Sequence, residues 1–345
     1  MPVVCGEIVP PVLVAVRNRI GHLTLNRPAE LNRLSLPMIR QLWEQLHLWA
    51  VDPSILVVVL RAIGEEAFCV GIDSPRLDDS EACIDAQRFA LIKKNALIHY
   101  IHSYPKPILA LMDGLVLSDG MGLAQGATFR VISGRVKMGL PQVRAGYFPD
   151  AGASYFLPRL PGELGIYLGV TGSQIRTVDA LYSRLADWCL PSDHLKAFDH
   201  GLDNLSENKP PRDALHSLLR TYAADKLPGA ELKAFRRGID EYFSIPDLPS
   251  IRQALLMEDR AEYQDWAEET VTLMDSRSSF AMTVTLEMLR RGRVLSLIDC
   301  FALERHLHRG WMSHEGTVMR DLFSHTQANA EQVRRLLAAP DLFRK

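Results

Sequence analysis

The stretch of residues 107–161 constrains the fold more than any other part of the chain. An apolar, strand-like run at 107–112 leads into a glycine-rich turn around Asp119, and a helix-like run follows that turn. A second turn holds Gln142 and, eight residues later, Asp150. Glycine adopts backbone conformations that other residues avoid, so the stretch predicts sharp turns that carry amide and carboxyl side chains.

Strand-like and helix-like runs alternate through the first part of the chain. Two short runs at 12–16 and 20–25 predict a β-hairpin. Ser35, with Pro37 two residues later, is typical of a helix start, and apolar residues follow at helical spacing. A continuous apolar run at 55–60 predicts a buried strand. Further helices are expected at 86–102, 162–168 and 177–185. This alternation predicts an α/β core.

The composition changes near residue 205. Residues 206–213 are polar, include two prolines and predict a linker. Beyond them only helical spacing recurs, and helices are expected at 215–222, 231–242, 251–257, 263–274, 280–291, 295–308 and 330–337. We therefore expect a core at 1–204 and a helical region at 205–345.

Composition and charge exclude several classes of protein. A formal net charge of -2 gives no general attraction for nucleic acid. The five cysteines are scattered without metal-ligand spacing, so we expect no metal site and reduced thiols. The first apolar run is too short for a signal peptide or a membrane span, which predicts a cytoplasmic protein without membrane contact. Neither a dinucleotide-binding glycine motif nor a P-loop lysine occurs.

Three loops place polar groups where they suit chemistry, and each has a plainer alternative. The loop at 68–73 turns at Gly71 and exposes N–H groups that can hold an oxyanion, or it is an ordinary turn. Asp119 faces a site or caps the helix that follows it. Asp150 acts as a general acid or base, or caps a helix. Gln142 is neutral and only donates or accepts hydrogen bonds.

The histidines give no Ser–His–Asp arrangement. Ser154 does not lie in the G-x-S-x-G pattern of a nucleophile elbow. Five histidines in helix-like runs are expected to be solvated or half-buried, namely His102, His194, His200, His306 and His308.

A set of motifs in a fixed order resembles the enoyl-CoA hydratase (crotonase) superfamily. These motifs are Asn26-Arg27-Pro28 with Leu31-Asn32, residues 67–73, Lys106-Pro107 through Asp113-Gly114, and Gly120-Met121-Gly122-Leu123. Others resemble the 3-hydroxyisobutyryl-CoA hydrolase branch, at residues 148–152, 156–162, 168–172, 289–292 and 314–316. The resemblance covers nearly the whole chain.

The resemblance implies a spiral of ββα repeats and a coenzyme A thioester as ligand, with no other cofactor. It implies that the N–H groups of Ile72 and Asp119 hold the thioester oxygen. Gln142 and Asp150 take the places of a glutamate and an aspartate that flank the thioester carbon. Coenzyme A is expected against Ala29, Glu30, Leu31, Phe68, Val70, Gly71, Asp73, Gly120 and Phe148. A homo-oligomer, trimer or hexamer, and a place in valine catabolism are also implied.

Two positions depart from the family pattern: Gln142 replaces the glutamate, and Asp119 replaces a glycine of the oxyanion loop. A carboxylate about 4 Å from an oxyanion costs roughly 4 kcal/mol at an effective dielectric constant of about 20. This cancels the roughly 3–4 kcal/mol that one oxyanion donor contributes. Asp119 therefore points away as a helix cap, is protonated, or forms a new acidic pair with Asp150.

Three functions are consistent with these residues. The first is an acyl-CoA hydrolase of the 3-hydroxyisobutyryl-CoA type with Asp150 as acid or base. The second is an enoyl-CoA hydratase or isomerase with Asp150 as single base, which the loop Gly71-Ile72-Asp73 favours and the long helical tail disfavours. The third is a non-catalytic acyl-CoA-binding protein, because the usual glutamate is Gln142.

Overall fold

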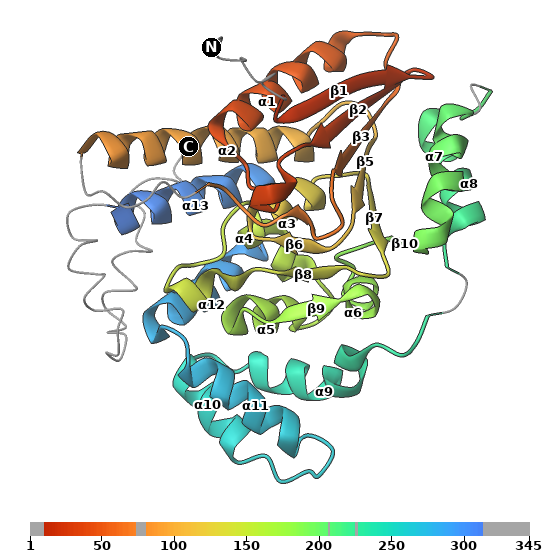
Figure 1. Ribbon diagram of the computed structural model, residues 1–345. Coiled ribbons are helices and arrows are strands. Elements are labelled where there is room, and N and C mark those ends of the chain that lie inside the picture. Colours follow the sequence, from red (N-terminus) through yellow and green to blue (C-terminus); the bar gives the residue numbers. More distant parts are fainter. Residues whose placement is uncertain (1–9, 74–80, 206–207, 225–226, 313–345) are drawn as a thin grey trace, which may run out of the picture.

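A computed structural model of the chain describes residues 10–73, 81–205, 208–224 and 227–312, and only the backbone of residues 81–88. Its strands form two β-sheets that helices enclose (Figure 1). Strands and helices alternate up to residue 190, and the described residues beyond it form helices and their connections. The expected α/β core with a helical C-terminal region is confirmed.

The larger sheet has six strands. In the order in which they lie, they are β1 (Val12–Arg17), β2 (Ile20–Leu25), β3 (Val57–Ala62), β5 (Ile108–Met112), β7 (Phe129–Ser133) and β10 (Trp188–Leu190). β1 and β2 pair antiparallel, which confirms the hairpin, and all other neighbours are parallel. Parallel neighbours need long crossover connections, and these connections carry the second sheet and the helices.

The smaller sheet has four short strands. They are β4 (Ala67–Cys69), β6 (Leu115–Leu117), β8 (Lys137–Gly139) and β9 (Gln174–Arg176). The first three are parallel, and β9 runs antiparallel to β8. Along the chain β4 follows β3, β6 follows β5, and β8 follows β7, each time passing from the larger sheet to the smaller one. A helical segment comes next each time, so the chain forms the expected spiral of ββα turns.

The α-helices of the described residues vary from one turn to six. They are α1 (Leu36–Val51), α2 (Glu81–His102), α3 (Asp119–Gln125), α4 (Ala153–Phe156), α5 (Leu164–Thr171), α6 (Thr177–Tyr182), α7 (Leu195–Asp203), α8 (Pro211–Tyr222), α9 (Glu231–Phe243), α10 (Leu248–Leu256), α11 (Gln264–Asp275), α12 (Ser279–Gly292) and α13 (Leu297–Met312). Four short 3-10 helices are η1 (Pro28–Glu30), η2 (Pro141–Ala145), η3 (Leu157–Arg159) and η4 (Ser192–His194).

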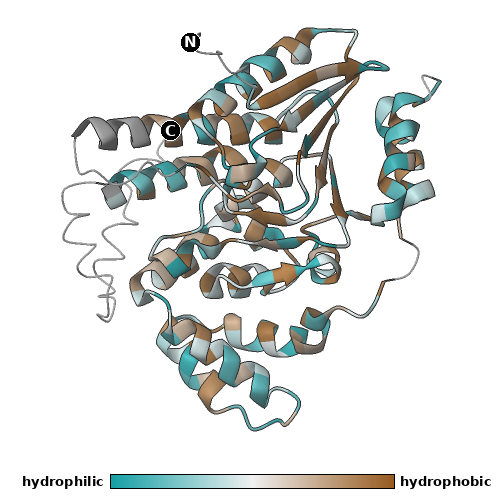
Figure 2. Cartoon of the chain, viewed as in Figure 1, coloured by the Kyte–Doolittle hydropathy of each residue, from teal (hydrophilic) through white to brown (hydrophobic). Residues whose placement is uncertain are grey.

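Alternation along the strands builds a core on each face of the larger sheet. On β3, Val58 and Leu60 join the main core, which includes α1, α2 and the smaller sheet. Val57 and Val59 face the other way and join a second core with α7 and α8. A period of two residues sends neighbouring side chains to opposite faces, so both faces of this strand are apolar. Figure 2 shows the corresponding run of hydrophobic residues along the strands.

The C-terminal helices pack closely against the core. α12 contacts α4 and α5, and α13 contacts α2 and α4. At the end of α12 only glycine fits, because a Cβ atom on Gly292 would lie 1.9 Å from the backbone oxygen of Ser154. This close approach holds the start of α13 beside the turn that follows Asp150.

The sequence located most of the long elements and missed the short ones. The helix start at Ser35 is confirmed, since its side chain accepts a hydrogen bond from the backbone N–H of Met38. The strands β4, β6, β8, β9 and β10 are three residues long, too short to show periodicity, and were not predicted. Nor was α7, while α8 begins inside the expected linker. The helix expected at 330–337 lies outside the described residues.

The helix expected at 86–102 is confirmed as part of α2, and its apolar residues do not all face the core. Phe89 and Ile92 are 41% and 57% exposed. The buried face of α2 instead carries Lys94, Leu97 and Ile98.

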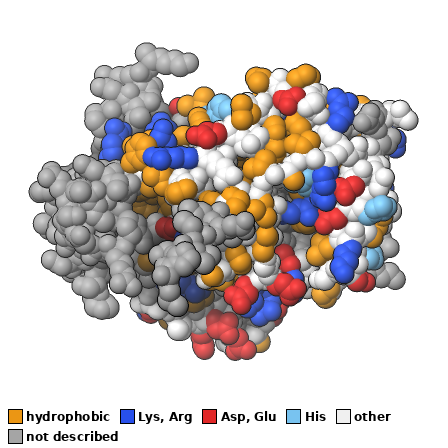
Figure 3. All heavy atoms as spheres, turned by 45° about the horizontal axis from the view of Figure 1, so that its top comes forward, with side chains coloured by type: hydrophobic (Ala, Val, Ile, Leu, Met, Phe, Trp, Pro, Cys, Tyr) orange, Lys and Arg blue, Asp and Glu red, His pale blue; other side chains and the backbone are white. Residues whose placement is uncertain are grey.

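Charge on the surface is mixed. On the face in Figure 3, acidic and basic side chains are interspersed around apolar ones. Within the described ranges, no helix is long and apolar enough to cross a membrane.

The second core predicts a large effect of Phe198 on stability. Phe198 is fully buried between α7 and the sheet. We expect Phe198→Ala to lower the free energy of unfolding by about 3–5 kcal/mol, because it removes apolar contacts and leaves a cavity. The matched control is Phe89→Ala on the exposed side of α2, with an expected change of about 0.5 kcal/mol. Denaturant unfolding measures both, and equal losses would contradict the second core.

Candidate active site

The fold brings the two predicted oxyanion loops together. Leu34 pairs with Ile72 in a parallel bridge, which fixes the loop that follows β4. Gly71 has φ +125°, a conformation that favours glycine. A Cβ atom there would lie 3.3 Å from Ser118 and 3.5 Å from Oδ2 of Asp119. Ile72 and Asp119, 47 positions apart in sequence, are therefore neighbours at one spot.

Asp119 is not the cap of its helix. It is the first residue of α3, and Ser118, with φ +50°, takes the N-cap position. The Asp119 carboxylate instead faces the backbone N–H of Ile72, which favours its charged form. Burial raises the pKa of Asp119, and the nearby Lys94 only partly opposes this. The carboxylate thus occupies one of the two N–H groups that were expected to hold a thioester oxygen.

Lys94 is the centre of the site, and the sequence analysis missed it. Its side chain is 1% exposed and comes from α2. The ammonium nitrogen lies 2.7 Å from Oδ1 of Asp119 and 2.5 Å from Oδ2 of Asp150. Burial by itself would lower the pKa of Lys94, but the two carboxylates outweigh it and raise the pKa above its usual range. Lys94 is therefore a fixed cation between two buried acids.

Asp150 is buried and fully engaged by side chains. Its Oδ2 contacts Lys94, and its Oδ1 accepts a hydrogen bond of 3.2 Å from Nε2 of Gln142. Burial alone would raise the pKa of Asp150, but Lys94 and His308 hold it well below its usual range. Asp150 does not cap α4, whose N-cap is Gly152. The acidic pair of Asp119 and Asp150 anticipated from the sequence thus exists, with a lysine between the two carboxylates.

His308 corrects a second expectation. It was expected to be solvated or half-buried, but it is 7% exposed and its Nε2 lies 3.3 Å from Oδ2 of Asp150. Its other ring nitrogen, Nδ1, makes a short hydrogen bond with the hydroxyl of Tyr147. The helical C-terminal region therefore contributes directly to the site, through α13.

Signals for both missed residues were present in the sequence. Lys94 lies three and four residues before the apolar Leu97 and Ile98, which places it on the buried face of a helix. His308 lies seven residues after Phe301, on the same helix face. A lysine or histidine on an apolar face needs a buried partner, so each position was a site candidate.

The expected coenzyme A segments also lie together. Ala29 and Glu30 are exposed in η1, and Leu31 follows in the left-handed conformation. An ion pair of 2.7 Å between Arg27 and Asp73 ties this segment to the loop at 71–73.

Other expected coenzyme A contacts differ in accessibility. Val70 is half-buried, while Gly71 and Gly120 are buried backbone positions. Phe68 and Phe148 are 1% and 0% exposed and belong to the core, so their rings support the site from behind.

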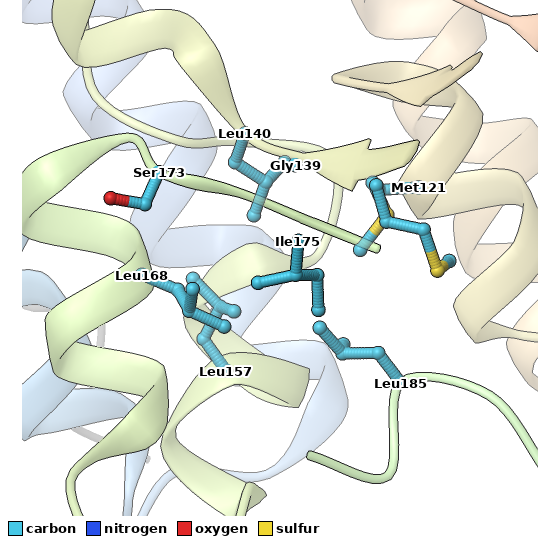
Figure 4. A pocket seen from close by; sticks show the side chains of 9 residues that line it. Met121, Gly139, Leu140, Leu157, Leu168, Ser173, Ile175 and Leu185 are labelled. Carbon is cyan, nitrogen blue, oxygen red and sulfur yellow. The ribbon is translucent and has the colours of Figure 1, made fainter. Parts of the chain in front are cut away.

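A small cavity lies behind the oxyanion loop (Figure 4). It has a volume of about 10 Å³, enough for one water molecule. Its lining is almost entirely apolar, with Met121 of α3 on one side and Leu140 and Ile175 on others. None of its lining residues is titratable, so the cavity supplies packing space and no acid–base group.

Comparison with known proteins identifies the family. The family described as enoyl-CoA hydratase/isomerase matches residues 20–328, so the chain belongs to it, and the resemblance seen in the sequence is confirmed. The chain is 31% identical over 296 residues to the mitochondrial 3-hydroxyisobutyryl-CoA hydrolase of Xenopus tropicalis, covering 85% of this chain and 76% of that protein. The expectation of an acyl-CoA enzyme therefore stands at the level of the family.

Two further similarities differ in kind. The crystal structure of a carnitinyl-CoA dehydratase from Mycobacterium thermoresistibile aligns with a TM-score of 0.82 and 31% identity, covering 96% of this chain and 97% of that one. The small ribosomal subunit protein mS47 of Neurospora crassa is 31% identical over 322 residues, covering 86% of this chain and 62% of that protein. The chain is thus similar over most of its length to proteins with quite different names.

The buried lysine predicts a strong and pH-dependent effect on stability. Lys94→Met leaves two buried carboxylates without their cation, which costs about 3–5 kcal/mol at neutral pH. The pKa of both carboxyls then rises in the folded state, so folding binds protons. A raised pKa in the folded state favours folding at low pH. We therefore expect the loss of unfolding free energy caused by Lys94→Met to become smaller as the pH falls from about 7.5 to about 5.

Lys93→Met is the matched control, because Lys93 neighbours Lys94 on α2 and is exposed. Denaturant unfolding of both variants and the wild type at the two pH values gives the comparison. The assignment would be contradicted by equal losses in the two variants, or by a Lys94→Met loss that grows on acidification.

Proposed function

We propose that the chain is an acyl-CoA thioester hydrolase of the 3-hydroxyisobutyryl-CoA type. The observation that carries the proposal is the convergence of Asp150 and Gln142 with the N–H groups of the two oxyanion loops at one buried spot. Similarity to a hydrolase of that name over 85% of the chain supports the substrate class. Valine catabolism, a cytoplasmic location and a homo-oligomer remain predictions, and the relative's name points to mitochondria instead.

The thioester oxygen would be held by the N–H groups of Ile72 and Asp119. The first of these now faces the Asp119 carboxylate, so substrate binding must move that carboxylate aside. Lys94 makes this possible, because an ammonium 2.7 Å from the carboxylate offsets the repulsion between that carboxylate and an oxyanion. Lys94, a residue on another helix, therefore compensates part of the cost that the sequence suggested for Asp119.

Gln142 has a role that an amide can fill. Its Nε2 donates to Asp150, and its buried Oε1 has no donor among the described residues. A buried acceptor without a donor is costly, so this oxygen suits a water molecule or a hydroxyl group of the substrate. Gln142 would thus position water or the 3-hydroxyl group beside the thioester carbon.

A non-catalytic acyl-CoA-binding protein is the second candidate. The observation in its favour is the Asp119 carboxylate, which already occupies the Ile72 N–H. The similarity to a ribosomal protein is consistent with a family member that has a non-enzymatic role.

A hydratase or isomerase is the third candidate, and the helical tail no longer argues against it. The aligned dehydratase structure covers 96% of this chain, tail included. The distinction between hydrolysis and hydration therefore rests on the products.

Thiol release tests the proposal directly. Purified protein with 3-hydroxyisobutyryl-CoA should release free thiol, and Asp150→Asn should lower kcat by about 10²–10⁴-fold. Ultraviolet spectra of enoyl-CoA substrates provide the contrast, since hydration or isomerisation changes conjugation and hydrolysis does not. Thiol release at the buffer rate, with acyl-CoA binding intact by calorimetry, would favour the binder.

The two departures from the family pattern predict gains in activity. Asp119→Gly frees the Ile72 N–H while Lys94 keeps Asp150 as its partner, so kcat should rise by up to about 10²–10³-fold. Gln142→Glu is nearly isosteric but places a second carboxylate against Asp150. One of these two carboxyl groups then keeps a proton near neutral pH. The increase in kcat of the Gln142→Glu variant should therefore become larger as the pH rises.

The double variant Gln142→Glu with Asp119→Gly should exceed both single variants in kcat/KM. Thiol release at the buffer rate in all four proteins, with acyl-CoA binding intact, would mean that these two residues do not account for the missing hydrolysis, and the hydrolase proposal would give way to the binder.

A further inference from the structure

Asp150 is poorly placed to exchange a proton by itself. Its Oδ1 accepts the Gln142 amide, and its Oδ2 lies against both the Lys94 ammonium and His308. Each carboxylate oxygen therefore already faces a donor within the protein. A carboxylate held in this way is a fixed anion, and a neighbouring group must carry the proton that the reaction moves.

His308 is the titratable neighbour built for that task. Nε2 of its ring lies 3.3 Å from Asp150, and Nδ1 meets the Tyr147 hydroxyl. The ring thus connects a buried anion to a half-buried phenol in a continuous line. Phe148 packs against the His308 ring at 5.2 Å between centroids, and Trp311 covers Tyr147 and Phe148 at 5.1 and 5.2 Å.

Glu304, one helical turn before His308 on α13, fixes the position of the His308 ring. Glu304 is fully buried on α13. Its Oε2 accepts the backbone N–H of Gly152 at 2.9 Å, and its Oε1 accepts the Ser154 N–H at 3.0 Å and hydroxyl at 2.7 Å. These bonds attach α13 to the turn that directly follows Asp150. Residues four apart share a helix face, so this attachment sets His308 over the carboxylate.

We propose that His308 is the proton-exchanging partner of Asp150, acting through a Tyr147–His308–Asp150 chain that the C-terminal helix completes. The proposal rests on the proposed hydrolase function. His308 is a positioning and proton-relay residue in this chain, and the Tyr147 hydroxyl is the group that would exchange a proton with water.

Hydrolysis would move one proton from water to His308 and back to the sulfur. A water proton passes to the Tyr147 oxygen while the Tyr147 hydroxyl proton passes to Nδ1 of neutral His308, and the hydroxide forms a bond to the thioester carbon. The carbon–sulfur bond then breaks with its electron pair on sulfur. The imidazolium returns its proton by the same route to the sulfur, giving a carboxylic acid and free thiol. Asp150 stays ionised throughout and stabilises the imidazolium.

Charged groups on four elements surround the Asp150–His308 pair. Asp150 faces His308 directly, Asp119 lies behind Lys94 from α3, and Glu304 precedes His308 on α13. Lys94 opposes them from α2.

The first test is the pH dependence of hydrolysis. In the wild type, kcat/KM should rise along one limb as the pH rises, because the ring must be neutral at Nδ1 to accept the proton from Tyr147. His308→Asn should lower kcat by about 10²–10⁴-fold and remove that limb, while calorimetry shows unchanged acyl-CoA affinity. His306→Asn is the matched control, a half-buried histidine two residues away on α13, and should keep both rate and limb. An unchanged limb in His308→Asn would overturn the proposal.

The second test needs no activity. In protein carrying ¹⁵N-labelled histidine, the signal that His308→Asn removes belongs to His308. At a fixed pH the ¹⁵N chemical shifts of its ring should change in Asp150→Asn, because the carboxylate beside Nε2 is lost. Ring shifts that stay the same would overturn the proposal, whether or not the protein hydrolyses acyl-CoA. A His308 signal that responds to Asp150→Asn, in a protein that binds acyl-CoA but does not hydrolyse it, would overturn the hydrolase function. It would still support the contact between His308 and Asp150.

Discussion

The arrangement of this site depends on one buried lysine between two carboxylates. Two acids that are each about 5% exposed would repel each other strongly in the protein interior without a cation. Lys94 lies within 2.7 Å of both and makes their burial tolerable. Asp119 can therefore stand in an oxyanion loop, where an isolated carboxylate would cancel the loop's purpose.

The same lysine links parts of the chain that are distant in sequence. It comes from α2, while Asp119 begins α3 and Asp150 precedes α4. α13 closes the cluster from the other side through Glu304 and His308. The C-terminal helices are thus part of the site, which explains why α12 approaches the core so closely at Gly292.

Much of the fold was predictable from sequence, because long elements carry their own pattern. The hairpin, α1 and the apolar strands β3 and β5 follow from periodicity and capping residues. The three-residue strands of the smaller sheet do not, since their pairing depends on the spiral as a whole. The resemblance to a family supplied that spiral where local pattern could not.

The site residues that lie in turns were predictable from the sequence, and those that lie in long helices were not. Asp119, Gln142 and Asp150 lie in turns whose glycines and prolines mark special backbone, so sequence analysis found them. Lys94 and His308 lie in the middle of long helices, where a charged residue usually faces solvent. Their roles come from tertiary contacts between α2, α13 and the turns, and helical phase was the only local signal of burial.

A crystal structure of the protein with a bound acyl-CoA would show directly whether Lys94 lets the Asp119 carboxylate move out of the oxyanion loop. We expect a thioester oxygen within about 3 Å of the N–H groups of Ile72 and Asp119. We also expect the Asp119 carboxylate to have left the Ile72 N–H and to remain on Lys94. A thioester bound elsewhere, or an Asp119 carboxylate still on the Ile72 N–H beside the bound ligand, would contradict this expectation.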